Sequence, residues 1–215
     1  MNACYFDMDG TLIDSRADLA ATVNHTRRDL GLAEKPQDEI LSHVGRGARH
    51  LLANAIPEAG GDASIVERFM GHYGEHMLES VTLYPGVRRT LEELRDRGWL
   101  LGVNTAKPRF ATLAILEHFG LKRLFGDAIV AGGDCAEMKP SALPLRQCAS
   151  LMRGHRVSAY DWMVGDNWTD VECARNAGVK SAFCAFGFGI LGETSPTVKI
   201  NRFDELLRFL KREED

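Results

Sequence analysis

The sequence predicts an α/β fold in which a parallel-sheet core carries an inserted helical cap. One observation is that short apolar runs typical of strands alternate with segments of helical spacing, which favours a parallel sheet with right-handed crossovers. The other is that roughly ninety residues separate the first strand, ending at Phe6, from the next, starting near Leu100, far more than one crossover helix needs. That interval has helical spacing too. We therefore expect a core of residues 1–14 and 83–215 and a helical cap of residues 15–82.

The expected core strands are short, apolar and followed by polar or glycine residues: Ala3–Phe6, Leu100–Asn104, Ala128–Ala131, Trp162–Val164 and Ser181–Ala185. Helical patterns lie between them and at the C-terminal end: Val87–Arg97, Arg109–Phe119, Ala142–Leu151, Thr169–Ala177 and Asp204–Arg212. Within the insert the helical patterns are Arg16–Leu30, Gln37–Val44, Ala48–Ile56 and Ala63–Ser80. The turn Tyr84-Pro85-Gly86 suits the return from the cap to the core, because Pro and Gly redirect the backbone.

The composition argues against several classes of partner. Net charge is −4, from 26 basic and 30 acidic residues, so nothing draws the whole chain to nucleic acid or to an anionic membrane. The five cysteines form no C-x-x-C pair, which favours a reducing compartment over a disulfide framework or a zinc site. Neither a signal-peptide pattern nor a bilayer-length apolar run is present. We expect a soluble, cytoplasmic monomer or homodimer.

Two carboxylates, Asp7 and Asp9, follow the first strand directly, and Gly10 then lets the backbone turn. A buried strand cannot hold unpaired charge, so both belong at its carboxyl end, where open α/β sheets place their ligands. Two acids this close share either a proton or a cation. Asp7 can attack phosphorus and form an aspartyl phosphate. Asp9 is placed to protonate the leaving oxygen and then to activate water.

Polar stretches follow the next three strands as well: Thr105 with its neighbours, Lys139-Pro140, and Gly165-Asp166-Asn167-Trp168-Thr169-Asp170. Parallel strand ends lie side by side, so these stretches should converge on the first two acids. Asp166 suits Mg²⁺ as an oxygen ligand, with Asp7 and a backbone carbonyl near Asp9 as the other protein ligands. Asp170 either binds the metal through water or orients Lys139.

Two further residues can stabilise a transferring phosphoryl group. Lys139 is a cation that would stabilise both the carboxylate and the phosphoryl oxygens, and Thr105 is a hydroxyl donor. Each feature alone has a structural explanation, since turns collect Asp and Gly, and Asp166 or Thr169 can cap a helix. Four such features in order, each after a predicted strand, favour a Mg²⁺-dependent phosphoryl-transfer site.

The order Asp7-x-Asp9-Gly10-Thr11, Thr105, Lys139-Pro140, Gly165-Asp166-x-x-x-Asp170 resembles the haloacid dehalogenase superfamily. The resemblance implies a Rossmann-like core with a mobile cap, here of the type inserted after the first strand. Members with an acid at the position of Asp9 are phosphatases or phosphomutases, so Asp9 argues against dehalogenation.

Within the superfamily the chain most resembles the phosphoglycolate phosphatase group, in Phe6–Asp14, Val44–Ala48, Leu83–Val87 and Gly165–Gly178. The resemblance implies a Mg²⁺-dependent phosphomonoesterase for a small anionic metabolite, with 2-phosphoglycolate the leading candidate. A departure is Thr105-Ala106-Lys107, where relatives commonly show Thr-Asn-Lys. The alternatives are a phosphatase for sugar phosphates (including an amino-sugar acid phosphate), a β-phosphoglucomutase-like phosphomutase, and a non-catalytic phosphate-binding regulatory module.

The cap loop Val44–Arg49 offers a site for substrate selection. Its two glycines give a flexible turn, and Arg46 could reach an anionic group from the cap; the resemblance implies that this loop faces the active site. The alternative is a helix–helix turn with exposed arginines. The other expected substrate contacts lie beside the motifs: Gly10, Thr11, Ala106, Lys107 and Asn167.

Overall fold

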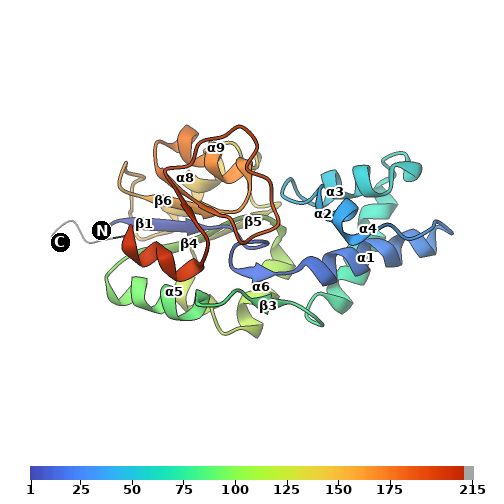
Figure 1. Cartoon of the computed structure of the whole chain (residues 1–215), viewed down its shortest axis with the longest axis horizontal. Coiled ribbons are helices and arrows are strands. Elements are labelled where there is room, and N and C mark those ends of the chain that lie inside the picture. The colour runs from blue at the N-terminus through green and yellow to red at the C-terminus, as the bar shows by residue number, and fades with distance from the viewer. Residues whose placement is uncertain (211–215) are drawn as a thin grey trace.

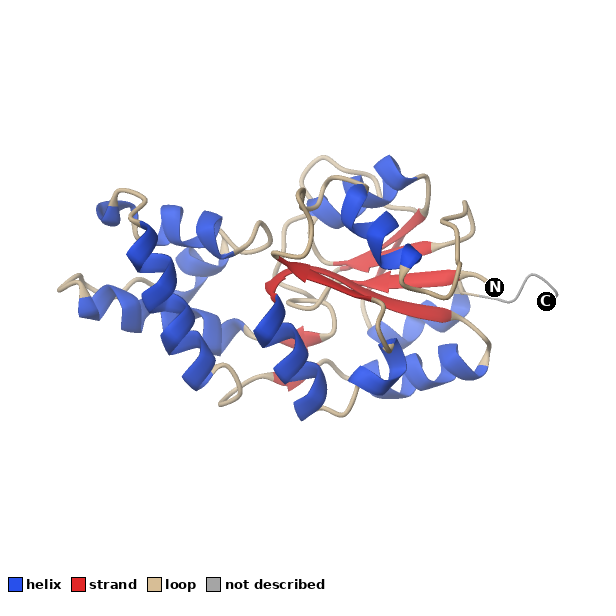
Figure 2. Cartoon of the chain, turned by 180° about the vertical axis from the view of Figure 1, so that it is seen from behind, coloured by secondary structure: helices blue, strands red, loops and turns tan. Residues whose placement is uncertain are grey.

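The computed structural model describes residues 1–210 and contains a six-stranded, wholly parallel sheet (Figures 1 and 2). The strand order is β5-β4-β1-β6-β7-β8. The strands are β1 (Ala3–Phe6), β4 (Leu100–Pro108), β5 (Ile129–Gly132), β6 (Trp162–Gly165), β7 (Lys180–Cys184) and β8 (Val198–Ile200). The predicted α/β fold class is confirmed, and the first strand along the chain lies inside the sheet between β4 and β6.

Helices cover both faces of the sheet, as the alternation of side chains in β1 requires. Cys4 and Phe6 belong to the apolar cluster on one face, and Ala3 and Tyr5 to the cluster on the other. Figure 1 shows α8 and α9 over one face and α5 on the opposite side. The core helices are α5 (Val87–Asp96), α6 (Arg109–His118), α7 (Lys122–Phe125), α8 (Leu143–Ser150) and α9 (Trp168–Ala177).

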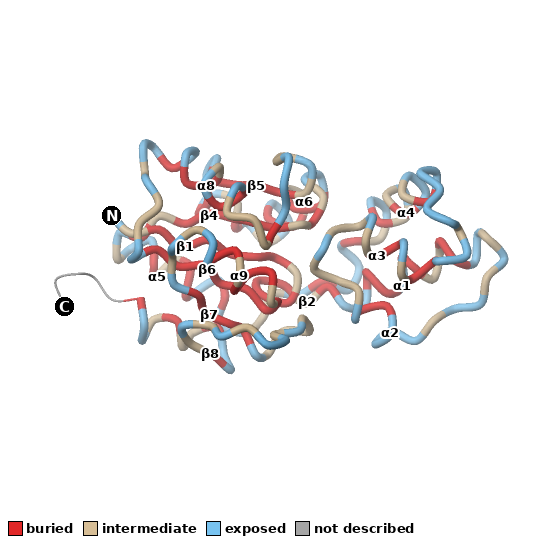
Figure 3. Tube along the Cα trace, turned by 90° about the horizontal axis from the view of Figure 1, so that it is seen from above, coloured by how far each residue is buried: buried red, intermediate tan, exposed pale blue. Residues whose placement is uncertain are grey.

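The insert is helical and lies beyond one end of the sheet (Figures 1 and 3). It comprises α1 (Arg16–Asp29), α2 (Gln37–Leu41), α3 (Ala48–Ala55), the 3₁₀ helix η1 (Pro57–Ala59) and α4 (Ala63–His76). These helices share their own apolar cluster, which includes Val23, Ile40 and Phe69. The two chain crossings to the core pair as short antiparallel strands, β2 (Ile13–Asp14) and β3 (Thr82–Leu83). The exact domain bounds stay a prediction.

Besides the short elements α7, η1, β2 and β3, which were not predicted, three elements of the core differ from the expectation. β4 continues to Pro108, and its register against β5 shifts between Asn104 and Pro108, an irregularity that re-aims the intervening side chains. β8 was not predicted, because three edge residues give no clear period. The closing segment forms the 3₁₀ helix η2 (Phe203–Arg208), which buries residues three apart, while residues 211 and 212 of the predicted helix lie outside the described residues.

Across residues 1–210, no helix has both the length and the apolar character that crossing a membrane requires.

Candidate active site

Three buried carboxylates, those of Asp7, Asp166 and Asp170, meet at the carboxyl edge of the sheet. One oxygen from each lies within 4.8 Å of the other two, and within the described chain they are the only such group of potential metal-binding side chains. Burial, reinforced by the charges of Asp7 and Asp170, raises the pKa of Asp166 well above its usual range. Crowded oxygen donors of this kind fit a hard divalent cation such as Mg²⁺, whose charge would offset their repulsion.

Asp166 is fixed by the backbone around it. Its Oδ2 accepts hydrogen bonds from the N–H groups of Phe188 (3.0 Å) and Gly189 (2.7 Å), in the loop after β7. On the other side the loop after β1 approaches so closely that a Cβ added to Gly10 would lie 1.8 Å from the same oxygen. Only glycine fits there, and its φ of +78° also favours glycine. The carboxylate is therefore held in one orientation toward the acidic group.

Lys139, in the loop after β5, links two of the carboxylates. Its Nζ lies 3.0 Å from Asp7 Oδ1 and donates to Asp170 Oδ1 at 2.6 Å. Asp170 also takes part in the capping box of α9: its Oδ2 accepts the Asn167 N–H (3.0 Å), and the Asn167 side chain accepts the Thr169 N–H (3.2 Å). Burial opposes the charge of Lys139, but Asp170 and Asp7 outweigh it and raise the pKa, so the side chain stays an ammonium.

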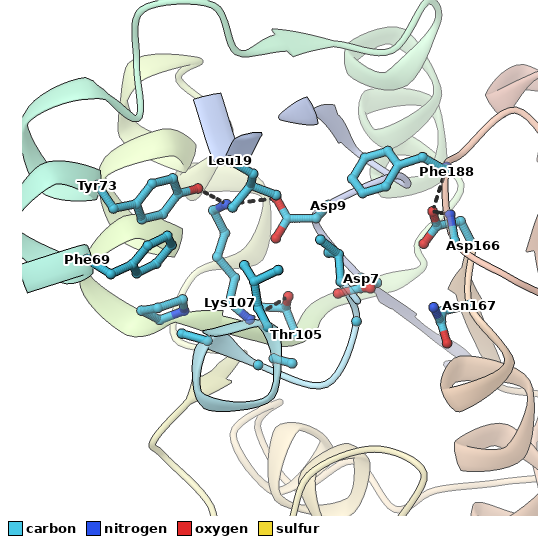
Figure 4. Close-up of a pocket in the computed structure, with 18 residues that line it drawn as sticks. Asp7, Asp9, Leu19, Phe69, Tyr73, Thr105, Lys107, Asp166, Asn167 and Phe188 are labelled. Atoms are coloured by element: carbon cyan, nitrogen blue, oxygen red, sulfur yellow. Dashed lines mark hydrogen bonds and ion pairs between the residues drawn. The ribbon is translucent and has the colours of Figure 1, made fainter. Parts of the chain in front are cut away.

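Asp9 is held by a second buried lysine. Its Oδ1 accepts hydrogen bonds from Ser15 Oγ (2.6 Å) and from Lys107 Nζ (2.7 Å). Lys107 also donates to the hydroxyl of Tyr73, which comes from α4 of the insert. Figure 4 shows Tyr73, Lys107 and Asp9 in one row. Burial opposes the charge of Lys107, yet its neighbours Asp9 and Tyr73 raise its pKa above the usual value. Through Lys107, the Tyr73 hydroxyl of α4 is thus linked to the acidic edge of the core.

A cavity of about 50 Å³ lies between the sheet edge and the insert. Its polar lining comes mainly from the core: Asp7, Asp9, Thr105, Lys107, Asp166 and Asn167. Its lining from the insert is mainly apolar, as Figure 4 shows for Leu19 and Phe69: Leu19, Val44, Ala48, Leu51 and Phe69, with Tyr73 as the exception. A space of this size admits a small polar group or a few waters.

The structure brings most of the predicted motif residues together. Thr105 lines the cavity, and its Oγ1 accepts the backbone N–H of Lys107 (3.2 Å). Ala106, Lys107 and Asn167 line the cavity as well. Gly10 instead packs against Asp166 without lining the cavity.

Two residues expected at the substrate lie elsewhere. Thr11 is fully buried outside the cavity lining, and its hydroxyl has no partner among residues 1–210. Arg46 is exposed and does not line the cavity, whereas its neighbours Gly45 and Gly47 do. The reason is a close approach of the loop to the core: a Cβ at Gly45 would lie 2.7 Å from Asn167 Nδ2, so the glycines face inward.

Three parts of the site were not predicted: Ser15, Tyr73 and the backbone donors of Phe188 and Gly189. Ser15 had no distinguishing feature in the sequence. Tyr73 had none either, because it repeats the apolar spacing of α4 four residues after Phe69. The backbone donors of Phe188 and Gly189 did have a signal: two alternating glycines, Gly187 and Gly189, shortly after a predicted strand, which mark a close backbone approach.

A family model, curated relatives and solved structures all match most of the chain. The family model described as "Haloacid dehalogenase-like hydrolase" matches residues 4–184. A phosphoglycolate phosphatase from Chromobacterium violaceum is 36% identical over 98% of this chain and 97% of its own length. One from Agrobacterium fabrum is 37% identical over 94% of this chain and 88% of its own length. Among solved structures, a predicted phosphoglycolate phosphatase from Haemophilus somnus superposes with a TM-score of 0.89 at 27% identity, covering 98% of both chains.

Proposed function

Because the chain belongs to the haloacid dehalogenase-like hydrolases, as its four motifs indicated, we propose that it is a Mg²⁺-dependent phosphomonoesterase that works through an aspartyl phosphate on Asp7. The observation that carries the proposal is the position of Asp7. Its carboxylate lines the cavity and lies beside a buried lysine and two further buried carboxylates. A nucleophile, a fixed cation and a set of hard oxygen ligands are the parts that phosphoryl transfer from an anionic ester needs.

In the first step a carboxylate oxygen of Asp7 attacks phosphorus, and the bond from phosphorus to the alcohol oxygen breaks. Asp9 in its protonated form gives that oxygen its proton, so the product leaves as a neutral alcohol group. In the second step Asp9, now ionised, takes a proton from a water that attacks the phosphoryl group. Inorganic phosphate leaves, and Asp7 regains its carboxylate. Ser15 and Lys107 hold the Asp9 side chain throughout.

The remaining groups stabilise charge. Lys139 lies against Asp7, where it can also meet the oxygens of the phosphoryl group, and Thr105 can donate its hydroxyl hydrogen to them. Asp7, Asp166 and a backbone carbonyl near Asp9 would hold Mg²⁺. When bound, the ion neutralises the repulsion between the carboxylate nucleophile and the phosphate.

We propose 2-phosphoglycolate as the substrate. The support for this substrate is the named activity of the relatives. The direct test is phosphate release from 2-phosphoglycolate, sugar phosphates and a nucleoside monophosphate, with Mg²⁺ and with EDTA. We expect metal-dependent release that favours 2-phosphoglycolate. Release favouring a sugar phosphate would overturn the substrate, and an active Asp7→Asn variant would overturn the nucleophile.

A further inference from the structure

We propose that Tyr73 and Lys107 form the specificity pair of this enzyme and bind the carboxylate of a short phosphorylated hydroxy acid. The proposal rests on the phosphomonoesterase function proposed above and says how that site would select its substrate. It assigns a substrate-binding role to Tyr73 of the insert, a residue outside all four sequence motifs.

Within residues 1–210, the pair offers two hydrogen-bond donors that have no acceptor. The Lys107 ammonium has three hydrogens, and among the described residues it donates to Asp9 Oδ1 and the Tyr73 hydroxyl. The Tyr73 oxygen accepts from Lys107, and within residues 1–210 no acceptor takes its own O–H. Both residues line the cavity although they are almost fully buried. A carboxylate has two oxygens and could accept one bond from each donor.

The rest of the cavity offers an anion no comparable site. Among its described lining residues Lys107 is the only cation, and the other insert side chains are apolar. Lys139 lies against Asp7 and Asp170, where it would meet the phosphoryl group itself and not a second anionic group. Asp7, Asp9 and Asp166 would repel a second anionic group placed anywhere else on the core side. The carboxylate of a bound substrate is therefore best placed at Lys107, whose ammonium offsets the charge of Asp9, and away from Asp7 and Asp166.

The hydroxyl of Tyr73 is held in a fixed position. Its ring stacks on that of Phe69, with centroids 5.6 Å apart and an interplanar angle of 15°, and Lys107 Nζ lies 4.9 Å from the ring centroid. Burial raises the pKa of Tyr73 to about 12, which keeps the phenol protonated and able to donate at neutral pH. Because Tyr73 comes from α4 and Lys107 from β4, the pair is complete only when the insert rests on the core.

The test compares 2-phosphoglycolate with 2-hydroxyethyl phosphate, which has the same length but carries a hydroxymethyl group in place of the carboxylate. The quantity measured is the ratio of the two kcat/KM values, for the wild type, for Tyr73→Phe and for Arg46→Ala. Tyr73→Phe removes one hydroxyl and keeps the stacked ring. Arg46→Ala is the matched control, because it removes the exposed insert cation that the sequence had suggested for the same task.

We expect the wild type to favour 2-phosphoglycolate by at least about tenfold, and Tyr73→Phe to reduce that ratio by about tenfold, mainly through the KM for 2-phosphoglycolate; a lost hydrogen bond to a charged group has an effect of this size. Arg46→Ala should leave the ratio unchanged. An equal loss with both substrates, or a ratio that falls in Arg46→Ala and not in Tyr73→Phe, would overturn the pair.

The wild type alone also tests the pair, even if a variant fails to fold. Equal hydrolysis of the two esters would overturn the specificity pair while leaving the phosphatase function intact. Release of phosphate from no ester at all would overturn the proposed function itself.

Discussion

Asp161 and Asp166 stand at the two ends of β6, one just before the strand and one just after it, and both are buried. Asp161 has its hydrogen bonds satisfied: it accepts the N–H of Ala3 at 2.9 Å, the Ser158 N–H at 3.1 Å, and bonds His155 Nε2 at 2.8 Å. Asp166 also accepts two backbone N–H bonds, but it faces two other carboxylates. Two acids on one strand thus have opposite surroundings, and the carboxyl end of the sheet is the end where ligands bind.

Asp161→Asn should therefore lower stability and leave turnover intact. An amide cannot replace every acceptor that Asp161 provides, and an unsatisfied buried group costs about 1–3 kcal/mol. Urea unfolding should show a loss of that order, with kcat for phosphate release unchanged. Asp166→Asn should do the reverse and reduce kcat by about 10²-fold or more, without loss of stability in EDTA. An inactive but stable Asp161→Asn enzyme would contradict this assignment.

Stability in the absence of metal should fall as pH rises. The pKa of Asp166 is raised in the folded state, so the folded protein keeps a proton that the unfolded chain loses above about pH 4. Folding then becomes less favourable as pH increases toward the raised pKa. Mg²⁺ should offset the fall, and an excess of 100-fold over its Kd should add about 2.7 kcal/mol. Thermal unfolding at pH 5 and pH 8, in EDTA and in Mg²⁺, measures both effects. The pH dependence should be weaker in Asp166→Asn; the same fall in that variant would assign it to another group.

The residues that meet at the sheet edge were predictable because a parallel sheet converts sequence order into spatial adjacency. Asp7, Lys139 and Asp166 each follow a strand, so their convergence required only the strand assignments. Tyr73 was not predictable, because helical spacing identifies the buried face of α4 but not which core residue that face meets. The exposed position of Arg46 was not predictable for a similar reason: a cation in a glycine-rich loop does not indicate which way the loop turns.

Lys139 should matter for both folding and catalysis. Lys139→Met leaves Asp170 and Asp7 buried without their cation, and removing one partner of a buried ion pair typically costs about 3–5 kcal/mol. The double variant Lys139→Met/Asp170→Asn should recover part of that loss, since it removes one of the uncompensated charges. Activity should stay low in both, because the phosphoryl oxygens still lack the ammonium. Urea unfolding with phosphate-release assays on the two variants and on Asp170→Asn completes the cycle. Additive stability losses would show that Lys139 and Asp170 do not act as a pair.

Alanine substitutions at Gly10 and Gly178 distinguish the effect of backbone strain from the effect of displacing Asp166. Their φ angles are +78° and +76°, so an alanine at either position adopts a left-handed conformation that costs roughly 1–2 kcal/mol. At Gly178, the C-terminal cap of α9, an added Cβ meets nothing within 4 Å. At Gly10 it would lie 1.8 Å from Asp166 Oδ2, so the carboxylate must move.

Both substitutions should therefore lower the free energy of unfolding, Gly10→Ala by more because the displaced Asp166 loses its backbone hydrogen bonds, but only Gly10→Ala should damage the reaction. A displacement of about 1 Å in a catalytic group can cost about 10²-fold in rate, and a displaced Asp166 should also raise the Mg²⁺ concentration needed for half-maximal activity. Mg²⁺ titrations of phosphate release, with Gly178→Ala as the control, measure this. If Gly10→Ala kept the wild-type metal dependence, the reaction would not depend on where Asp166 is held, and its assignment as a metal ligand would be wrong.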